Sequence, residues 1–167
     1  MALRTIITKE DPFLRRKARE VAQIDDRILT ILQDMAETMY EANGVGLAAP
    51  QIGQSIRLVV IDVPLEEDER TGPIVLINPC IVEKEGKQVF NEGCLSLPDF
   101  SCDVERAAKV KVEALDRDGR PFTTEAEGLL AICLQHELDH LDGKLAVDYI
   151  SPLKRALYRK RREKETN

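Results

Sequence analysis

Residues 125–142 read EAEGLLAICLQHELDHLD, and this stretch decides the fold. Apolar residues cover most of its circumference at helical spacing, which predicts a helix that ends at Gly143 and is buried by the rest of the chain. Runs rich in β-branched residues predict strands around it, at 57–63, 73–82, 87–91 and 109–115, with a returning strand after a turn at 116–121. Because the strands are grouped and do not alternate with helices, we expect an α+β fold with small mixed or antiparallel sheets around this central helix.

Two more helices are expected, one on each side of the predicted strands. Residues 25–44 carry an apolar stripe with helical spacing, an aspartate that can cap the first turn, and Gly44 at the end. A C-terminal helix is expected to begin at Ser151 and Pro152, since serine suits the cap and proline the first turn. We therefore expect a catalytic domain over residues 1–150 and a basic helix over 151–167 appended to the same domain.

The composition limits the class of protein. The chain has 167 residues, 43% of them hydrophobic and 32% charged, which is typical of one soluble globular domain. No apolar run approaches the roughly 18 residues that a membrane span needs, so we expect no membrane partner. The N-terminus does not resemble a secretory signal, which predicts a cytoplasmic protein whose cysteines are thiols or metal ligands. Residues 66–72 are expected to form a surface loop, and Cys80 is expected to lie in the core.

Charge is distributed unevenly along the chain. The net charge is −6, but residues 152–167 carry a balance of +5 and the remainder carries −11. A basic tail on an acidic body predicts an anionic partner for the tail. The alternative is a solvated, charge-rich helix without a partner.

The two histidines of the chain lie four residues apart, with a glutamate between them. His136 and His140 therefore share one face of the predicted helix, where two imidazoles can bind one ion, and Glu137 projects beside them. The alternative is a solvated helix face that happens to carry these residues. Because the helix is apolar over most of its surface, the histidines are expected to be buried, and a metal ion would satisfy them.

The third ligand is not found downstream. One zinc-peptidase pattern continues HExxHxxGxxH, and here the match fails at Ala146. The late glutamates, Glu163 and Glu165, lie in the charged tail. Cys94, in NEGCLSLPD (91–99), is the favoured choice, because Gly93 and Pro98 suit an extended loop that can reach the helix. A cysteine and two histidines leave a fourth position for water, as in catalytic sites.

The other cysteines are interpreted differently. Cys133 lies three residues before the first histidine and is read as a wall of the pocket, since its use as a ligand would spread the set over about 10 Å of helix. Cys102 has charged neighbours and no adjacent glycine.

Residues 44–53, GVGLAAPQIG, formally match a dinucleotide-binding fingerprint. They follow a predicted helix and not a strand, and Pro50 would interrupt a helix starting there, so we expect no dinucleotide. The segment is expected to be an extended strand whose bare backbone can pair with a peptide, with Gln51 as an amide donor. A glycine-rich turn into a core strand is the alternative.

Three motifs taken together resemble the peptide deformylases. The chain has GVGLAAPQ, EGCLS and QHELDH in the order and at the separations of that family. The likeness continues through VKVEALDRDGRPF, GLLAIC and SPLK, so it covers nearly the whole chain, and the basic tail is similar to that of the bacterial type. The resemblance implies a hydrolase that removes the formyl group from N-terminal formyl-methionine of new polypeptides.

The resemblance also implies roles for individual residues. Cys94, His136 and His140 would hold one divalent ion, typically Fe(II), with zinc, nickel or cobalt as replacements and water in the fourth place. Glu137 would act as general base and then general acid. The Leu95 backbone N–H and the Gln51 side chain would stabilise the oxyanion.

Substrate contacts are implied in the same way. Gly46 would pair with the peptide backbone, and the methionine side chain would enter a pocket formed by Val45, Phe90, Leu129, Ile132 and Cys133, with Glu92 nearby. The tail would dock on the ribosome. One departure is Ser101, which stands where many members have an arginine that contacts the peptide beyond methionine.

Two rival functions predict different behaviour. A zinc endopeptidase would need a carboxylate or third histidine as ligand and would cleave internal peptide bonds. A metal-stabilised binding module at the ribosome would keep both function and metal after Glu137→Ala.

Overall fold

The computed structural model describes residues 2–8, 11–64 and 72–166. Within these residues the helices are α1 (Asp26–Glu41), α2 (Gly128–Leu141) and α3 (Pro152–Thr166), and the 3-10 turns are η1 (Pro12–Arg15), η2 (Ala49–Ile52) and η3 (Ala146–Tyr149). The strands are β1 (Gly46–Ala48), β2 (Leu58–Ile61), β3 (Ile74–Glu85), β4 (Gln88–Cys94), β5 (Leu97–Arg106), β6 (Lys109–Leu115) and β7 (Pro121–Glu127). Among these helices, none is long and apolar enough to cross a membrane.

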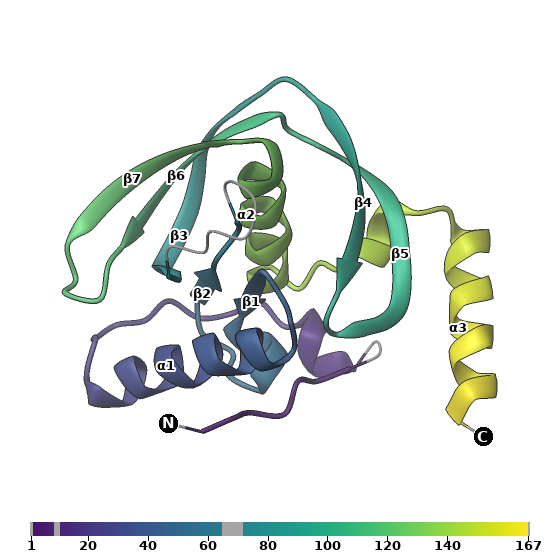
Figure 1. Ribbon diagram of the computed structural model, residues 1–167, viewed down its shortest axis with the longest axis horizontal. Coiled ribbons are helices and arrows are strands. Elements are labelled where there is room, and N and C mark those ends of the chain that lie inside the picture. Colours follow the sequence, from purple (N-terminus) through teal and green to yellow (C-terminus); the bar gives the residue numbers. More distant parts are fainter. Residues whose placement is uncertain (1, 9–10, 65–71, 167) are drawn as a thin grey trace.

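The strands form two antiparallel sheets around α2. One sheet has five strands in the order β1-β2-β3-β6-β7, and the other consists of β4 and β5. In Figure 1, α2 lies between the two sheets, and α3 lies beside β5 at the edge of the molecule. The predicted α+β fold around a central helix is therefore confirmed.

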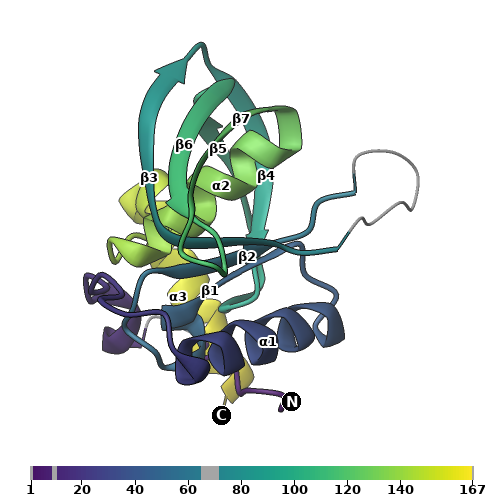
Figure 2. The same ribbon diagram turned by 90° about the vertical axis from the view of Figure 1, so that its left-hand side faces the viewer.

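Strand β2 shows how the five-stranded sheet separates two cores. Its side chains alternate between the two faces, as the period of a strand requires. Val59 and Ile61 belong to the core that includes α2, whereas Leu58 and Val60 belong to the core that includes α1. Figure 2 shows α1 and α2 on opposite sides of this sheet.

The predicted helix boundaries are close to those observed. Helix α1 ends at Glu41, before Gly44, because Asn43 adopts a left-handed backbone with φ of 57°. The predicted cap is present, since Asp25 Oδ1 accepts the Ile28 N–H at 3.1 Å. The helix predicted over 125–142 begins only at Gly128, whose φ is 59°, and residues 125–127 belong to β7.

Strand β5 was missed from the sequence. Pro98, Asp99 and Ser101 lower the strand propensity of this segment. Pairing with β4 overrides that local preference, because β5 buries Leu97, Phe100 and Val104. The extended loop predicted around Cys94 is therefore the turn of a hairpin.

Four other expectations are corrected or untested. In the 44–53 segment only Gly46–Ala48 is extended, and a 3-10 turn follows. Cys80 is exposed and not in the core, because it lies on the long, largely exposed second half of β3. The surface loop expected at 66–72 falls almost entirely on residues 65–71, outside the described part of the chain. The domain division at residue 150 stays a prediction.

Candidate metal centre

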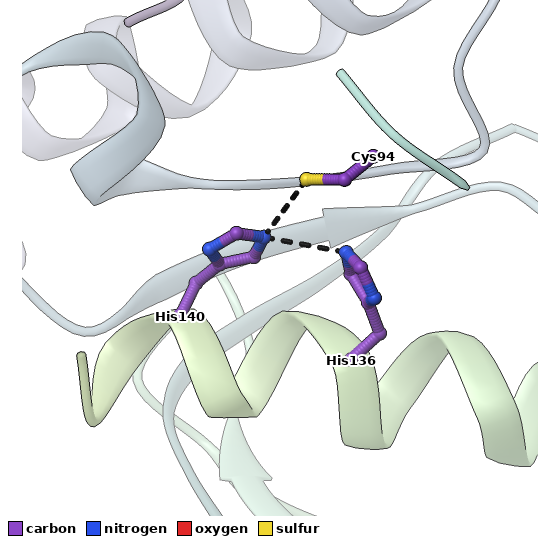
Figure 3. A group of neighbouring side chains, drawn as sticks. All are labelled: Cys94, His136 and His140. Carbon is purple, nitrogen blue, oxygen red and sulfur yellow. Dashed lines mark hydrogen bonds between the residues drawn. The ribbon is translucent and has the colours of Figure 1, made fainter. Parts of the chain in front are cut away.

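Three side chains from two elements converge at the C-terminal half of α2. Cys94 ends β4, and His136 and His140 lie one turn apart on α2, pointing to the same side (Figure 3). The His140 Nε2 atom lies 3.4 Å from the Cys94 sulfur and 3.3 Å from the His136 Nε2 atom. All three donor atoms lie within 4.8 Å of one another, which is the spacing of ligands around a shared cation.

The same region holds buried polar atoms that call for a partner. Among the described residues, Glu137 Oε2 and His140 Nδ1 are buried without a hydrogen-bond partner. One sulfur and two imidazole nitrogens are the donors that zinc and iron accept in proteins. The residues present therefore fit the metal ion that the sequence predicts.

A buried arginine links the β4–β5 hairpin to helix α2 at this centre. Arg106 forms a two-pronged ion pair with Glu92, both nitrogen–oxygen distances being 2.8 Å, and a third contact of 2.6 Å with Asp139. Glu92 Oε1 in turn lies 2.9 Å from His136 Nδ1. The contact with Glu92 fixes the ring of His136 so that its Nε2 atom faces the other two donors. Hydrogen-bond partners commonly orient metal-binding histidines in this way. The Tyr149 hydroxyl also donates to Asp139, at 2.6 Å.

Burial and neighbouring side chains shift the pKa of three buried groups at this centre. Burial raises the pKa of Glu137 to about 7, close to the value that suits a general base at neutral pH. The pKa of His140 is lowered by burial and by the neighbouring His136. Burial would also lower the pKa of His136, but contacts with Cys94 and Glu92 outweigh it and raise the pKa.

Glycine is required where β1 passes α2. A Cβ atom on Gly46 would lie 2.8 Å from Glu137 Oε1, so a side chain there would displace the carboxylate. Gln51 is also fixed: its oxygen accepts the Ala48 N–H at 2.9 Å, and its Nε2 donates to Ser96 Oγ at 3.0 Å and lies 3.8 Å from the Cys94 sulfur.

A cavity of about 320 Å³ opens beside the three donors. The structure brings every predicted catalytic and substrate-binding residue, together with two of the three predicted ligands, to its wall: Val45, Gly46, Gln51, Phe90, Glu92, Cys94, Leu95, Leu129, Ile132, Cys133, His136 and Glu137. His140 lies behind them and is 1% exposed. Glu92 differs from the prediction in one respect, because its carboxylate is engaged by Arg106 and His136.

Three residues around the site were missed. Ser96 belongs to the quoted EGCLS motif and Asp139 to QHELDH. Because Asp139 lies on a helix that was predicted to be buried, its charge could have indicated a positively charged partner. Arg106 gave no signal, because its role depends on β5, which was itself missed.

Comparison with known proteins settles the family. A sequence model described as polypeptide deformylase matches residues 3–156. The chain belongs to the polypeptide deformylase family. The resemblance seen in the sequence is thereby confirmed, and with it the expectation of an enzyme.

Individual deformylases support the assignment along the whole chain. The peptide deformylase of Alkalilimnicola ehrlichii is 54% identical over 164 residues, covering 98% of this chain and 91% of the relative. A crystal structure of a peptide deformylase from Legionella pneumophila has a TM-score of 0.91 and 51% identity, covering 99% and 96% of the two chains. A Met-Ala-Ser bound structure of a class I type b peptide deformylase from Acinetobacter baumannii has a TM-score of 0.84 and 32% identity, covering 89% and 99%.

Proposed function

We propose that this chain removes the formyl group from N-terminal formyl-methionine of new polypeptides in the cytoplasm, with one divalent metal ion. The observation that carries the proposal is the meeting of Cys94, His136 and His140 beside a cavity that also contains Glu137. The Acinetobacter relative was solved with Met-Ala-Ser, a peptide that begins with methionine.

Cys94, His136 and His140 would hold the ion, Fe(II) by the family resemblance, with zinc, nickel or cobalt as replacements. When bound, such an ion lowers the pKa of water and polarises the formyl oxygen. The partner on His136 Nδ1 supports this role, because Glu92 leaves only Nε2 to face the ion.

Glu137 is the proton carrier of the proposed reaction. A carboxylate in the cavity wall beside the three donors can take the proton of the attacking water and return it to the leaving amine. The products are formate and a free methionine amine, so atoms and charge balance. The Leu95 N–H and the Gln51 amide would stabilise the developing oxyanion, and the contacts of Gln51 with Ala48 and Ser96 orient that amide.

The cavity suits an unbranched apolar side chain. Val45, Ile132 and Cys133 give it apolar walls, and Phe90 and Leu129 lie at its partly exposed part. Burial raises the pKa of Cys133 to about 12, so its thiol stays uncharged and acts as an apolar surface. Gly46, at the edge of the five-stranded sheet, is the proposed pairing point for the peptide backbone.

The decisive experiment measures formate release from a formyl-Met peptide under anaerobic conditions with Fe(II) supplied. The chain should release formate, and Glu137→Gln should keep the metal while losing at least about 100-fold in kcat, the usual size of a lost acid–base group. Absence of formate from the Fe(II)-loaded chain would exclude a deformylase. Cleavage of internal bonds in unformylated peptides would instead favour an endopeptidase.

We also propose that the basic tail docks on ribosomal RNA. Lys160 and Lys164 lie exposed on α3, in keeping with the positive charge of residues 152–167. Reversing both charges (Lys160→Glu with Lys164→Glu) should weaken cosedimentation with ribosomes and leave formate release from short peptides unchanged. Reversal of Lys109, an exposed lysine on β6, is the control. Equal ribosome binding by all three proteins would contradict docking through the tail.

A further inference from the structure

The hairpin that carries Cys94 has little support from backbone hydrogen bonds. Strands β4 and β5 pair with each other and, within the described residues, with no third strand. A two-stranded hairpin is marginally stable alone, so its position depends on side-chain packing. Cys94 lies at the end of β4, and the register shifts there between Gly93 and Cys94.

The packing on the turn end of this hairpin comes from a separate small core that includes α3. Leu97 and Phe100 of β5 are buried together with the following residues: Leu14, Leu145, Ala146, Val147 and Tyr158. Tyr158 is 7% exposed and is the one buried side chain among those described on α3. Its ring meets that of Phe100 edge-on, with centroids 4.8 Å apart.

Two side chains of α3 also hold the backbone of β5 directly. The Tyr158 hydroxyl donates to the Pro98 carbonyl at 3.2 Å, and Arg161 Nη2 donates to the Asp99 carbonyl at 2.7 Å. Asp99 has a φ of 59°, a left-handed conformation that surrounding contacts must maintain in a residue other than glycine. Figure 1 shows α3 running alongside β5, where these contacts are made.

We propose that α3 is a clamp on the cysteine turn, in which Tyr158 and Arg161 are positioning residues that hold Cys94 against the histidines of α2. The clamp acts on Pro98 and Asp99, only four and five residues after Cys94. It gives α3 a second role besides the proposed docking, since both use the same helix. The effect of the clamp on metal binding rests on the proposed function, in which Cys94 is a ligand. The contacts of α3 with the turn do not depend on that proposal.

The first test of the clamp needs no metal. Amide hydrogen exchange is measured on the metal-free full chain for Tyr158→Phe, Tyr158→Ala and Arg161→Gln. Exchange over residues 94–101 should accelerate about fivefold for Tyr158→Phe and Arg161→Gln, the effect of one lost hydrogen bond, and more for Tyr158→Ala. Exchange in α1 should not change. Lys160→Gln, an exposed neighbour on the same helix, is the matched control and should match the parent.

The second test follows metal release from the Co(II)-loaded chain into a chelator, using the sulfur-to-cobalt absorption band. Release should be about fivefold faster in Tyr158→Phe and Arg161→Gln than in Lys160→Gln. Unchanged exchange over 94–101 would overturn the clamp, and faster exchange without faster release would overturn its effect on Cys94. If the Co(II)-loaded unmutated chain had no sulfur-to-cobalt band, Cys94 would not be a ligand. This result would contradict the proposed function and not the clamp, so the two failures can be told apart.

Discussion

At the scale of single residues, the site depends on the absence of a side chain at Gly46. Gly46 has no Cβ, and the carboxylate of Glu137 occupies the space that one would fill. The sequence suggested a different reason for this glycine, namely room for a peptide. Both uses are compatible, because Gly46 lies in the cavity wall and on the edge strand of the five-stranded sheet, while an added Cβ would meet the carboxylate.

Gly46→Ala should therefore reduce formate release at least about tenfold, because even a small displacement of a catalytic group is costly. The metal content should stay the same, since none of the three ligands is touched. Gly93→Ala is the control: it also lines the cavity, but its Cβ would meet nothing nearer than 3.5 Å. Equal losses in the two variants would show that clash with Glu137 is not the cause.

The residues that sequence reasoning found and missed differ in a physical way. His136, His140 and Cys94 have side chains whose chemistry is rare and whose spacing is local or carried by a short motif. Arg106 is one of many arginines, and it becomes special only when β5 brings it between Glu92 and Asp139. Because the role of Arg106 comes from contacts between segments far apart in the chain, the sequence around it shows no pattern that would indicate the role.

At the scale of elements, Arg106 ties β5 to β4 and α2. Its side chain is 4% exposed and contacts two carboxylates. Glu92, Asp139 and Arg106 together carry a net charge of about −1. A protonated His136, which contacts Glu92, would neutralise it. Removing Arg106 would leave the buried Glu92 and the partly buried Asp139 without their cation.

Arg106→Met should therefore destabilise the metal-free chain by about 3–5 kcal/mol, the usual cost of breaking a buried ion pair from one side. Urea unfolding of both proteins measures the difference. Lys87→Met provides a comparison, because both side chains of its ion pair with Glu105 are largely exposed and the pair is worth less, about 1 kcal/mol at most. If the free energy of unfolding fell by the same amount in both variants, the buried network would contribute no more to stability than an exposed ion pair.

Local propensity explains which elements were predictable. Helix α2 and the β6–β7 hairpin follow from apolar periodicity and turn residues, and both are present at nearly the expected positions. Strand β5 does not follow, because its identity comes from pairing with β4 and packing against α3. The same contacts turn the expected loop at Cys94 into a tight turn.

At the scale of the whole molecule, the proposed metal would join parts that backbone hydrogen bonds leave separate. Cys94 belongs to the two-stranded sheet, and the histidines belong to a helix that packs on the five-stranded sheet. An ion shared between them would oppose their separation on unfolding.

Metal loading should therefore raise Tm. At a free ion concentration about 1,000 times Kd the gain is about 4 kcal/mol, or about 10 °C for a chain of this size. Thermal scans with and without Ni(II) measure the shift. Cys94→Ser should abolish most of it, whereas Cys102→Ser should keep it, because that thiol lies outside the three-ligand group. The same loss in both would contradict the choice of Cys94.

The β4–β5 hairpin makes its backbone hydrogen bonds within itself, and this gives the molecule a modular design. The hairpin carries the proposed ligand Cys94 together with part of the pocket wall, including Phe90 and Glu92. It meets the helices through side chains: Arg106 contacts Asp139 of α2, and Phe100 contacts Tyr158 of α3. A substitution that reshapes the pocket wall on this hairpin would therefore also move Cys94, unless the contacts with α2 and α3 held the turn in place.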